Sequence, residues 1–405
     1  PSGDPGPHGA TPCYERRMSA WINDWAQLLF RWVHVLAAIA WIGHAFFFHS
    51  MEKALRKPEV PGVDPDVFGE LWMVHGGGFF RMQKTRVLPP VFTGHLHWFK
   101  YEALLTWVSG FLLLVALYYM TGGIYMIDRS VMELTPLQAV GVGLGTLIGG
   151  WLVYDFLWAG PIGKANETVA TVLTVAMIAT IGVALTFVLS GRAAFLHTGA
   201  LLGTLMTGNV WIRIIPGSKK MVAALEKGEE PDLSLGAIGH QRSVHNGYMH
   251  FPIVFLMISN HYPFTSSGGL AWLVMLLMLG LGAAVRQLFY DGMQAHIAVK
   301  GYVVAALIAL IAITIPRSAF TAAPQAPDFA QVNQIIVERC TPCHAAQPSH
   351  PAFNAPPKNL VLTDPATVVA NKDAIYAQAV KTKVMPLGNL TNITEEERAL
   401  LGAWY

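Results

Sequence analysis

Residues 32–51, WVHVLAAIAWIGHAFFFHSM, form a run of 20 residues without a charge, bracketed by Arg31 and Glu52. A helix of about 20 apolar residues is long enough to cross the hydrocarbon core of a bilayer. This stretch therefore predicts a transmembrane helix, and it sets the length scale for interpreting the rest of the chain.

Charge-free runs of similar length recur along the sequence. They lie at 103–127, 134–154, 168–191 and 193–212, and a last span covers about 297–316 with Lys300 in its first turn. The uncharged stretch between Arg242 and Arg286 is too long for one helix, and HYPFTSSGG (261–269) divides it into two spans. The pattern thus predicts an all-α fold, with an eight-helix transmembrane bundle.

Composition supports a membrane protein and excludes other classes. Of the 405 residues, 53% are hydrophobic and only 13% charged, about half the charge of a soluble domain. The net charge of +2 comes without a basic block, so no nucleic-acid partner is expected. We divide the chain into an N-terminal extension (1–17) before a native start at Met18, a membrane domain (18–320), a linker (321–327) and a C-terminal domain (328–405).

Loop charges predict the orientation. If the N-terminus lies outside, the inward loops are 52–100, 160–167, 213–242 and 290–296, and these hold 13 Lys and Arg residues against two in the outward loops. The outward loops are 121–133, 191–192 and 260–268. Cytoplasmic loops are the Lys- and Arg-rich ones. We therefore expect a multi-pass protein of a bacterial inner membrane with its C-terminal domain in the periplasm.

The C-terminal domain carries VERCTPCHAAQ (337–347), a C-x-x-C-H motif for covalent attachment of a c-type haem. Thioethers to Cys340 and Cys343 would hold the porphyrin, and His344 would ligate the iron. Met385 is the expected second axial ligand, because His350 lies too close to His344 along the chain. The segment is therefore expected to be a small soluble cytochrome c domain, and Thr394 with Glu397 predicts a capping box for its last helix.

Histidines are unusually frequent in the membrane domain. Ionisable groups inside a bilayer are costly and are by default functional. The predicted spans divide them into a periplasmic layer and a cytoplasmic layer. The first contains His34, His197 and His261, and the second contains His44, His49, His250 and His296. A membrane-embedded b-type haem or another metal centre competes with a simpler explanation, in which interfacial histidines bond to carbonyls or lipid headgroups.

Further polar residues cluster at the cytoplasmic ends of the spans. Arg213 and Arg286 are candidates for holding an anionic substrate, and Asp155 or Asp291 for taking a proton. The alternative is that these residues are snorkelling helix ends or mutual ion pairs. Two structural expectations accompany them. Gly141, Gly145 and Gly149 should let another helix approach closely, and residues 74–102 should form a re-entrant or capping segment.

Several segments together resemble the bacterial membrane-bound urate oxidase (urate hydroxylase) family, which has a C-terminal cytochrome c domain. They are RWVHVLAAIAWIGHAFFFHSME (31–52), RVLPPVFTGHLHWFKYEALLTWVSG (86–110), GNVWIRIIPGSKKMV (208–222), RSVHNGYMHFPIVFLMISNHYPF (242–264) and the haem motif with MPLGNLTNITEEERALLGAW (385–404). More weakly, the first span is similar to haem-associated membrane proteins of the protoporphyrinogen oxidase type. That similarity makes His34 the first candidate for a b-haem ligand.

The family resemblance implies oxidation of urate to 5-hydroxyisourate without hydrogen peroxide. Electrons would pass to the fused c-type haem and on to the respiratory chain, through a soluble cytochrome c or a terminal oxidase. Two alternatives remain open from the sequence. One is a quinol-to-cytochrome c electron-transfer protein, and the other is a purine transporter with a cytochrome sensor domain.

Overall fold

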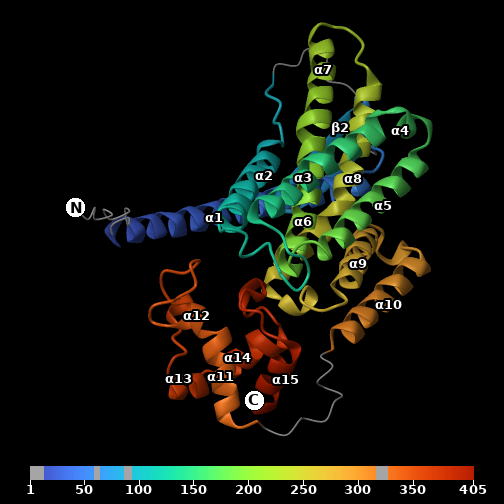
Figure 1. The fold of residues 1–405 in the computed structure, drawn as a ribbon. Helices are drawn as coiled ribbons and strands as arrows, with labels where there is room; N and C mark the ends of the chain where they lie inside the picture. Colours follow the sequence, from blue (N-terminus) through green and yellow to red (C-terminus); the bar gives the residue numbers. More distant parts are fainter. Residues whose placement is uncertain (1–12, 59–63, 86–93, 316–326) are drawn as a thin grey trace.

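The structure is a computed structural model that describes residues 13–58, 64–85, 94–315 and 327–405. It is mostly helical (Figure 1). Residues 1–12 of the expected extension and almost all of the expected linker lie outside the described residues.

The membrane domain is built from ten α-helices and two π-helical turns within the described ranges. These are α1 (Cys13–Ala54), α2 (Tyr101–Leu114), η1 (Val115–Tyr119), α3 (Pro136–Ala159), α4 (Pro161–Ala165), α5 (Glu167–Thr186), α6 (Gly191–Gly208), η2 (Asn209–Ile214), α7 (Ile215–Glu226), α8 (Leu233–Ile258), α9 (Ala271–Asp291) and α10 (Ile297–Thr314). The C-terminal domain contains α11 (Phe329–Arg339), α12 (Thr341–His344), α13 (Pro365–Ala370), α14 (Lys372–Ile375), η8 (Tyr376–Lys381) and α15 (Glu395–Trp404).

Six helical segments among the described residues are long and apolar enough to cross a membrane. They are α1, α2 with η1, α3 with α4, α5, α9 and α10. Large apolar side chains such as Trp32, Leu152 and Ile308 are exposed on them, as expected of surfaces that face lipid. The other two expected spans correspond to α6 and α8, which fall outside this group, so eight spans remain a prediction.

Helix α6 lies at the centre of the membrane domain. Most of its residues are buried, and it contacts α2, α3, α5 and α8. Ser190 caps its first turn by accepting a hydrogen bond from the Ala193 amide. A central helix surrounded by protein does not need a lipid-facing apolar surface. This explains why α6 carries buried polar residues such as His197 and Thr198.

The prediction that Gly141, Gly145 and Gly149 let another helix approach closely names the wrong face of α3. A Cβ at Gly141, Gly145 or Gly149 would meet no other atom within 4 Å. The close approaches on α3 are instead at Gly143, which leaves room for His197 and Tyr119, and at Gly150, which leaves room for Leu201. Helix α6 therefore packs against the side of α3 that carries Gly143 and Gly150, and not against the side that carries the four-residue glycine repeat.

The first long inward loop contains an antiparallel hairpin of β1 (Val67–His75) and β2 (Gly78–Thr85). This two-stranded sheet is a departure from the all-α expectation. Gly76 and Gly77 form the turn and both have positive φ, which suits a two-residue hairpin. Of the predicted re-entrant segment, residues 74–85 therefore belong to the hairpin, and residues 86–93 lie outside the described part of the chain.

The C-terminal domain has its own core, built around Val332, Ile336, Val368 and Leu401. Figure 1 shows this domain at one end of the bundle, opposite the end where α4 and α7 lie. A cavity of about 550 Å³ lies between the domains, and most of its lining comes from the three loops that the sequence predicts to face outward and from residues 383–398. The predicted outward loops and the C-terminal domain therefore share one end of the molecule.

Gly388 makes a close contact between the two domains. Its φ is +56°, in the region that favours glycine. A Cβ at this position would overlap the backbone carbonyl oxygen of Ile127 and lie 3.2 Å from that of Ile124. Because backbone meets backbone here, the contact tolerates little displacement.

Candidate functional site

The C-x-x-C-H motif lies at the junction of α11 and α12. The Cys340 carbonyl accepts hydrogen bonds from the amides of Cys343 (3.2 Å) and His344 (2.9 Å), which closes the motif into a helical turn. Both thiols are free. Burial, and then the neighbouring Cys343, raises the pKa of Cys340 to about 12, so its thiol is neutral at physiological pH.

The imidazole of His344 is oriented by the backbone. Its Nδ1 lies 3.0 Å from the Leu360 carbonyl oxygen. A carbonyl only accepts hydrogen bonds, so Nδ1 carries the proton and Nε2 is left with a lone pair. Metal-ligating histidines usually donate their second nitrogen in this way. Nε2 of His344 is therefore the nitrogen that could bind a metal ion.

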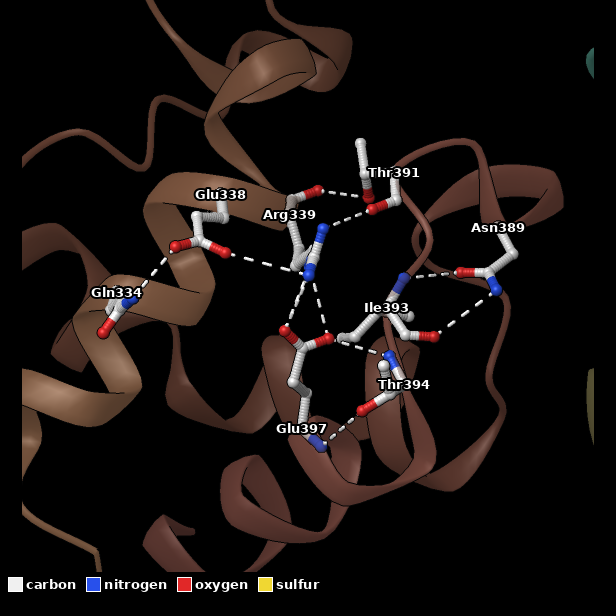
Figure 2. A network of polar contacts seen from close by, with 8 residues as sticks. All are labelled: Gln334, Glu338, Arg339, Asn389, Thr391, Ile393, Thr394 and Glu397. Atoms are coloured by element: carbon white, nitrogen blue, oxygen red, sulfur yellow. Dashed lines mark hydrogen bonds and ion pairs between the residues drawn. The ribbon is translucent and has the colours of Figure 1, made fainter.

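A charged network anchors the helix that leads into the motif (Figure 2). Arg339 precedes Cys340 and donates to both carboxylate oxygens of Glu397, with Nε distances of 3.0 and 3.2 Å. Its NH1 also donates to the Thr391 carbonyl at 2.9 Å. Burial would raise the pKa of Glu397, but hydrogen bonds from Arg339 and from the Thr394 amide outweigh it and lower the pKa. The predicted Thr394–Glu397 capping box is confirmed.

The two rival axial ligands are held differently. Met385 is half-buried in a loop fixed by the Gln378 carbonyl, which accepts from its amide at 3.0 Å, and by Arg398, which donates to its carbonyl at 2.8 Å. His350 is tied to the motif itself, since its amide donates to the Pro342 carbonyl and its Nδ1 accepts from the Ala352 amide. The structure thus gives His350 a local role beside the motif, and Met385 as the second axial ligand stays a prediction.

In the membrane domain, two of the four predicted catalytic residues form an ion pair. Arg213 Nε donates to Asp155 Oδ1 at 2.8 Å, and its NH2 contacts Oδ2. A second cation, Arg242, approaches Asp155 Oδ1 at 3.4 Å and is almost fully buried. Arg242 also stacks over the ring of Tyr154, at 4.9 Å from its centroid. We call Asp155, Arg213 and Arg242 the Asp155 cluster.

A neutral hydrogen-bond network extends the Asp155 cluster into the bundle. Asn209 Nδ2 donates to the Tyr154 hydroxyl and to Asn246 Oδ1, both at 2.9 Å. Tyr154 in turn lies 2.8 Å from His245 Nδ1. The π-helical turn η2 begins at Asn209 and places Arg213 beside Asp155, an irregularity that is frequent at functional sites.

Arg286 and Asp291, the other two predicted catalytic residues, are not paired with each other. Asp291 accepts from Lys53 at 3.2 Å and from the Gln287 amide. Arg286 is 7% exposed, and its NH2 lies 3.4 Å from His49 Nε2. Among the described residues it has no ion pair with a carboxylate, and its Nε has no hydrogen-bond partner. We call Arg286, His49 and the nearby His250 the Arg286 cluster.

The predicted periplasmic histidines have three different environments. His34 Nδ1 lies 2.8 Å from the Thr106 carbonyl, so Nε2 carries the lone pair, and Gly110 leaves room for its ring. His197 is fully buried, with Nδ1 on the Ala193 carbonyl (2.8 Å) and Nε2 on the Tyr119 hydroxyl (3.2 Å). His261 is exposed in a short 3-10 turn. Of the three, His34 has the arrangement expected of a ligand.

The predicted cytoplasmic histidines also do not share one site. His44 lies 3.7 Å from Glu102, and His296 is exposed and caps α10 by accepting from the Ala298 amide. His49 and His250 belong to the Arg286 cluster. In the described part of the chain, no group of three or more His, Cys, Asp or Glu residues is arranged to hold a metal ion.

Sequence reasoning missed Arg242 and Tyr154 as members of the Asp155 cluster. Arg242 was treated as the charged boundary of a span, yet α8 begins at Leu233 and carries it into the buried core. Tyr154 follows Trp151 by three residues and directly precedes Asp155. Its place at the inward end of α3 therefore indicated a residue close to that carboxylate. The sequence alone does not show which helix faces Arg242 or Tyr154.

Comparison with known proteins identifies the membrane domain. The family model described as urate oxidase N-terminal matches residues 20–317, which is most of the chain. No curated protein and no solved structure matches it. The chain therefore belongs to the urate oxidase N-terminal family.

Proposed function

We propose that this protein oxidises urate to 5-hydroxyisourate in its membrane domain and delivers the electrons to a c-type haem in its C-terminal domain. The observation that carries the proposal is the presence, in one chain, of the family match over residues 20–317 and of a C-x-x-C-H motif whose histidine is oriented for iron. Urate monoanion and one water would give 5-hydroxyisourate, one proton and two electrons. Water, and not dioxygen, would supply the oxygen atom.

The residues of the C-terminal domain fit a covalent haem. Cys340 and Cys343 would form the thioethers, His344 Nε2 would ligate the iron, and Met385 would take the opposite position. A haem bound in this way accepts and passes on electrons one at a time. The protein orients His344 through the Leu360 carbonyl and fixes the Met385 loop through Arg398.

We further propose that the protein lies in a bacterial inner membrane with this domain in the periplasm. The Lys- and Arg-poor loops 121–133, 191–192 and 260–268 lie beside the C-terminal domain, as the interdomain cavity shows. Such loops are typical of the outer side. A soluble cytochrome c or a terminal oxidase would then receive the electrons.

The test is an anaerobic spectrum of the purified full-length protein before and after urate. We expect urate to produce the reduced bands of a c-type haem, with no peroxide formed on later admission of air. Quinol added in place of urate distinguishes the quinol-to-cytochrome c alternative. Consumption of urate with a haem that stays ferric would contradict the proposal.

A second cofactor is proposed at His34. Arg286 follows Ala271 by 15 residues, and Ala271 lines the interdomain cavity. That separation is about 22 Å along a helix axis. For urate oxidised near Arg286, this distance is too long for efficient electron transfer to the C-terminal domain in a single tunnelling step. His34, with its free Nε2, would hold a b-type haem between them. A pyridine haemochrome assay should then show both haem types, and His34→Ala should remove only the b signal.

A further inference from the structure

The Arg286 cluster contains a buried positive charge that is not balanced locally. Arg286 is 7% exposed, and its hydrogen bonds reach only the neutral acceptors Gln287 Oε1 and His49 Nε2, both at 3.4 Å. Asp291, one helical turn further along α9 than Gln287, is already bound by Lys53. An unpaired buried charge costs several kcal/mol, on the order of what a bound counter-ion would recover.

Aromatic rings surround the guanidinium of Arg286. Its central carbon lies 4.0 Å from the centroid of the Tyr248 ring and 4.8 Å from that of Tyr290. The Tyr290 ring also stacks at 4.0 Å on His49. These faces offset part of the charge and favour a flat partner, since rings and guanidinium planes stack with one another.

His250 provides a second, independent indication of a ligand. It is 2% exposed, and neither of its ring nitrogens has a hydrogen-bond partner. Phe46 joins it to the Arg286 cluster, with ring centroids 5.6 Å from His250 and 6.3 Å from Tyr290. Buried polar groups are nearly always paired in native proteins, so an imidazole with no partner, near a guanidinium whose Nε has none, points to a polar molecule that binds both.

A cavity of about 400 Å³ adjoins the Arg286 cluster between α9 and α10. Its polar and aromatic lining comes from Tyr248, Gln287, His296 and Tyr302, and its remaining lining residues are three alanines and a valine. Tyr248 donates to Gln287 at 2.8 Å, and both residues also contact Arg286. The cavity has the size of a small-molecule pocket, and the Tyr248–Gln287 pair separates it from the guanidinium.

We propose that Arg286 anchors a planar organic anion that enters through this cavity, and that His250 hydrogen-bonds to its ring. The identity of the anion as urate rests on the function proposed above. Urate is flat, negatively charged and edged with N–H and C=O groups, which match the guanidinium, the imidazole and the Gln287 amide. The Asp155 cluster is a poorer site for an anion, because both of its arginines already contact a carboxylate, which would repel an added negative charge.

The inference is tested by equilibrium binding of radiolabelled urate to the full-length protein purified in detergent. Arg286→Gln should weaken binding by about tenfold to a hundredfold, the loss expected for a charge-assisted hydrogen bond. Arg286→Lys should fall between this variant and the native protein, because it keeps the charge and loses the flat fork. Lys220→Gln, on the exposed face of α7, removes the same charge and should bind normally.

His250→Phe and Tyr248→Phe extend the test without changing a charge. His250→Phe removes both ring nitrogens and should weaken binding by about tenfold. Tyr248→Phe keeps the ring and should change affinity only slightly. Should Arg286→Gln fail to fold, the ranking of Arg286→Lys and His250→Phe below the native protein carries the same test.

The outcomes separate this inference from the proposed function. If native protein binds urate and reduces its haem while Arg286→Gln and His250→Phe bind equally well, the site is wrong and the function stands. If native protein neither binds nor oxidises urate, the proposed function fails and the anion assignment falls with it. Loss of co-purified anionic lipid from Arg286→Gln, with urate binding unchanged, would show that Arg286 holds a lipid phosphate and would overturn the inference.

Discussion

The Asp155 cluster and the Arg286 cluster place the same residue type in opposite electrostatic settings. In the first, one carboxylate is shared by Arg213 and by the buried Arg242. In the second, Arg286 is equally buried but meets tyrosine rings and imidazoles. A paired arginine stabilises the fold, whereas an unpaired one retains its attraction for an external anion. The neighbouring carboxylate, and not the arginine, therefore distinguishes a structural cation from a binding one.

The largest effect is expected from removing the shared carboxylate. Asp155→Asn would leave Arg213 and Arg242 without a counter-charge and should lower the free energy of unfolding by about 3–5 kcal/mol. Thermal unfolding followed by circular dichroism in detergent measures this. Asp291→Asn is the matched control, since its pair with Lys53 is more exposed and should be worth about 1 kcal/mol or less. Equal losses for the two variants would remove the distinction between the clusters.

A smaller effect is expected from Arg213→Gln. Arg242 still faces Asp155 in this variant, so only one charged hydrogen-bond pair is lost, about 1.5–3 kcal/mol of stability. Urate affinity should stay within about twofold of the native value, because the Arg286 cluster is untouched. Both quantities can be measured on one preparation. A variant with native stability and lost urate binding would reverse the roles of the two clusters.

The smallest effect concerns a similar pair in the water-facing domain. The pKa of Glu397 is lowered, so its pairing with Arg339 stabilises the domain above the ordinary value of 4.5 and is lost as pH falls below it. Arg339→Gln should cost about 1 kcal/mol or less at neutral pH and flatten this acid dependence. Unfolding midpoints between pH 7 and pH 3 measure it. An acid profile that is unchanged in the variant would contradict the assignment.

The long-range architecture was largely predictable because lipid imposes a single, strong pattern. The apolar runs locate α3, α5 and α10 within about five residues, whereas α1 begins well before the run that predicts it. The motif of Cys340, Cys343 and His344 is visible in the sequence because covalent haem attachment needs a fixed local spacing, and haem binding there stays a prediction. The Thr394–Glu397 cap is equally local. Such features depend on neighbours in the chain, which a sequence displays directly.

The pairing of charges was not predictable, because it depends on which helices touch. The sequence groups the four candidate catalytic residues, Asp155, Arg213, Arg286 and Asp291, by depth alone. Depth does not show that Arg242 reaches Asp155 or that Lys53 reaches Asp291. The π-helical turn that aims Arg213 has no clear signature in residue type. The β1–β2 hairpin was different. Its Gly76-Gly77 turn was visible, but the apolar content of the loop favoured a membrane interpretation.

The seating of Gly388 on the Ile127 carbonyl has a kinetic consequence. Two domains in backbone contact do not need to find each other by diffusion. The electron transfer proposed between them would therefore be a first-order event over a set separation. Its rate should therefore be independent of protein concentration and nearly indifferent to ionic strength. Only the next transfer, to a mobile carrier, would depend on encounter.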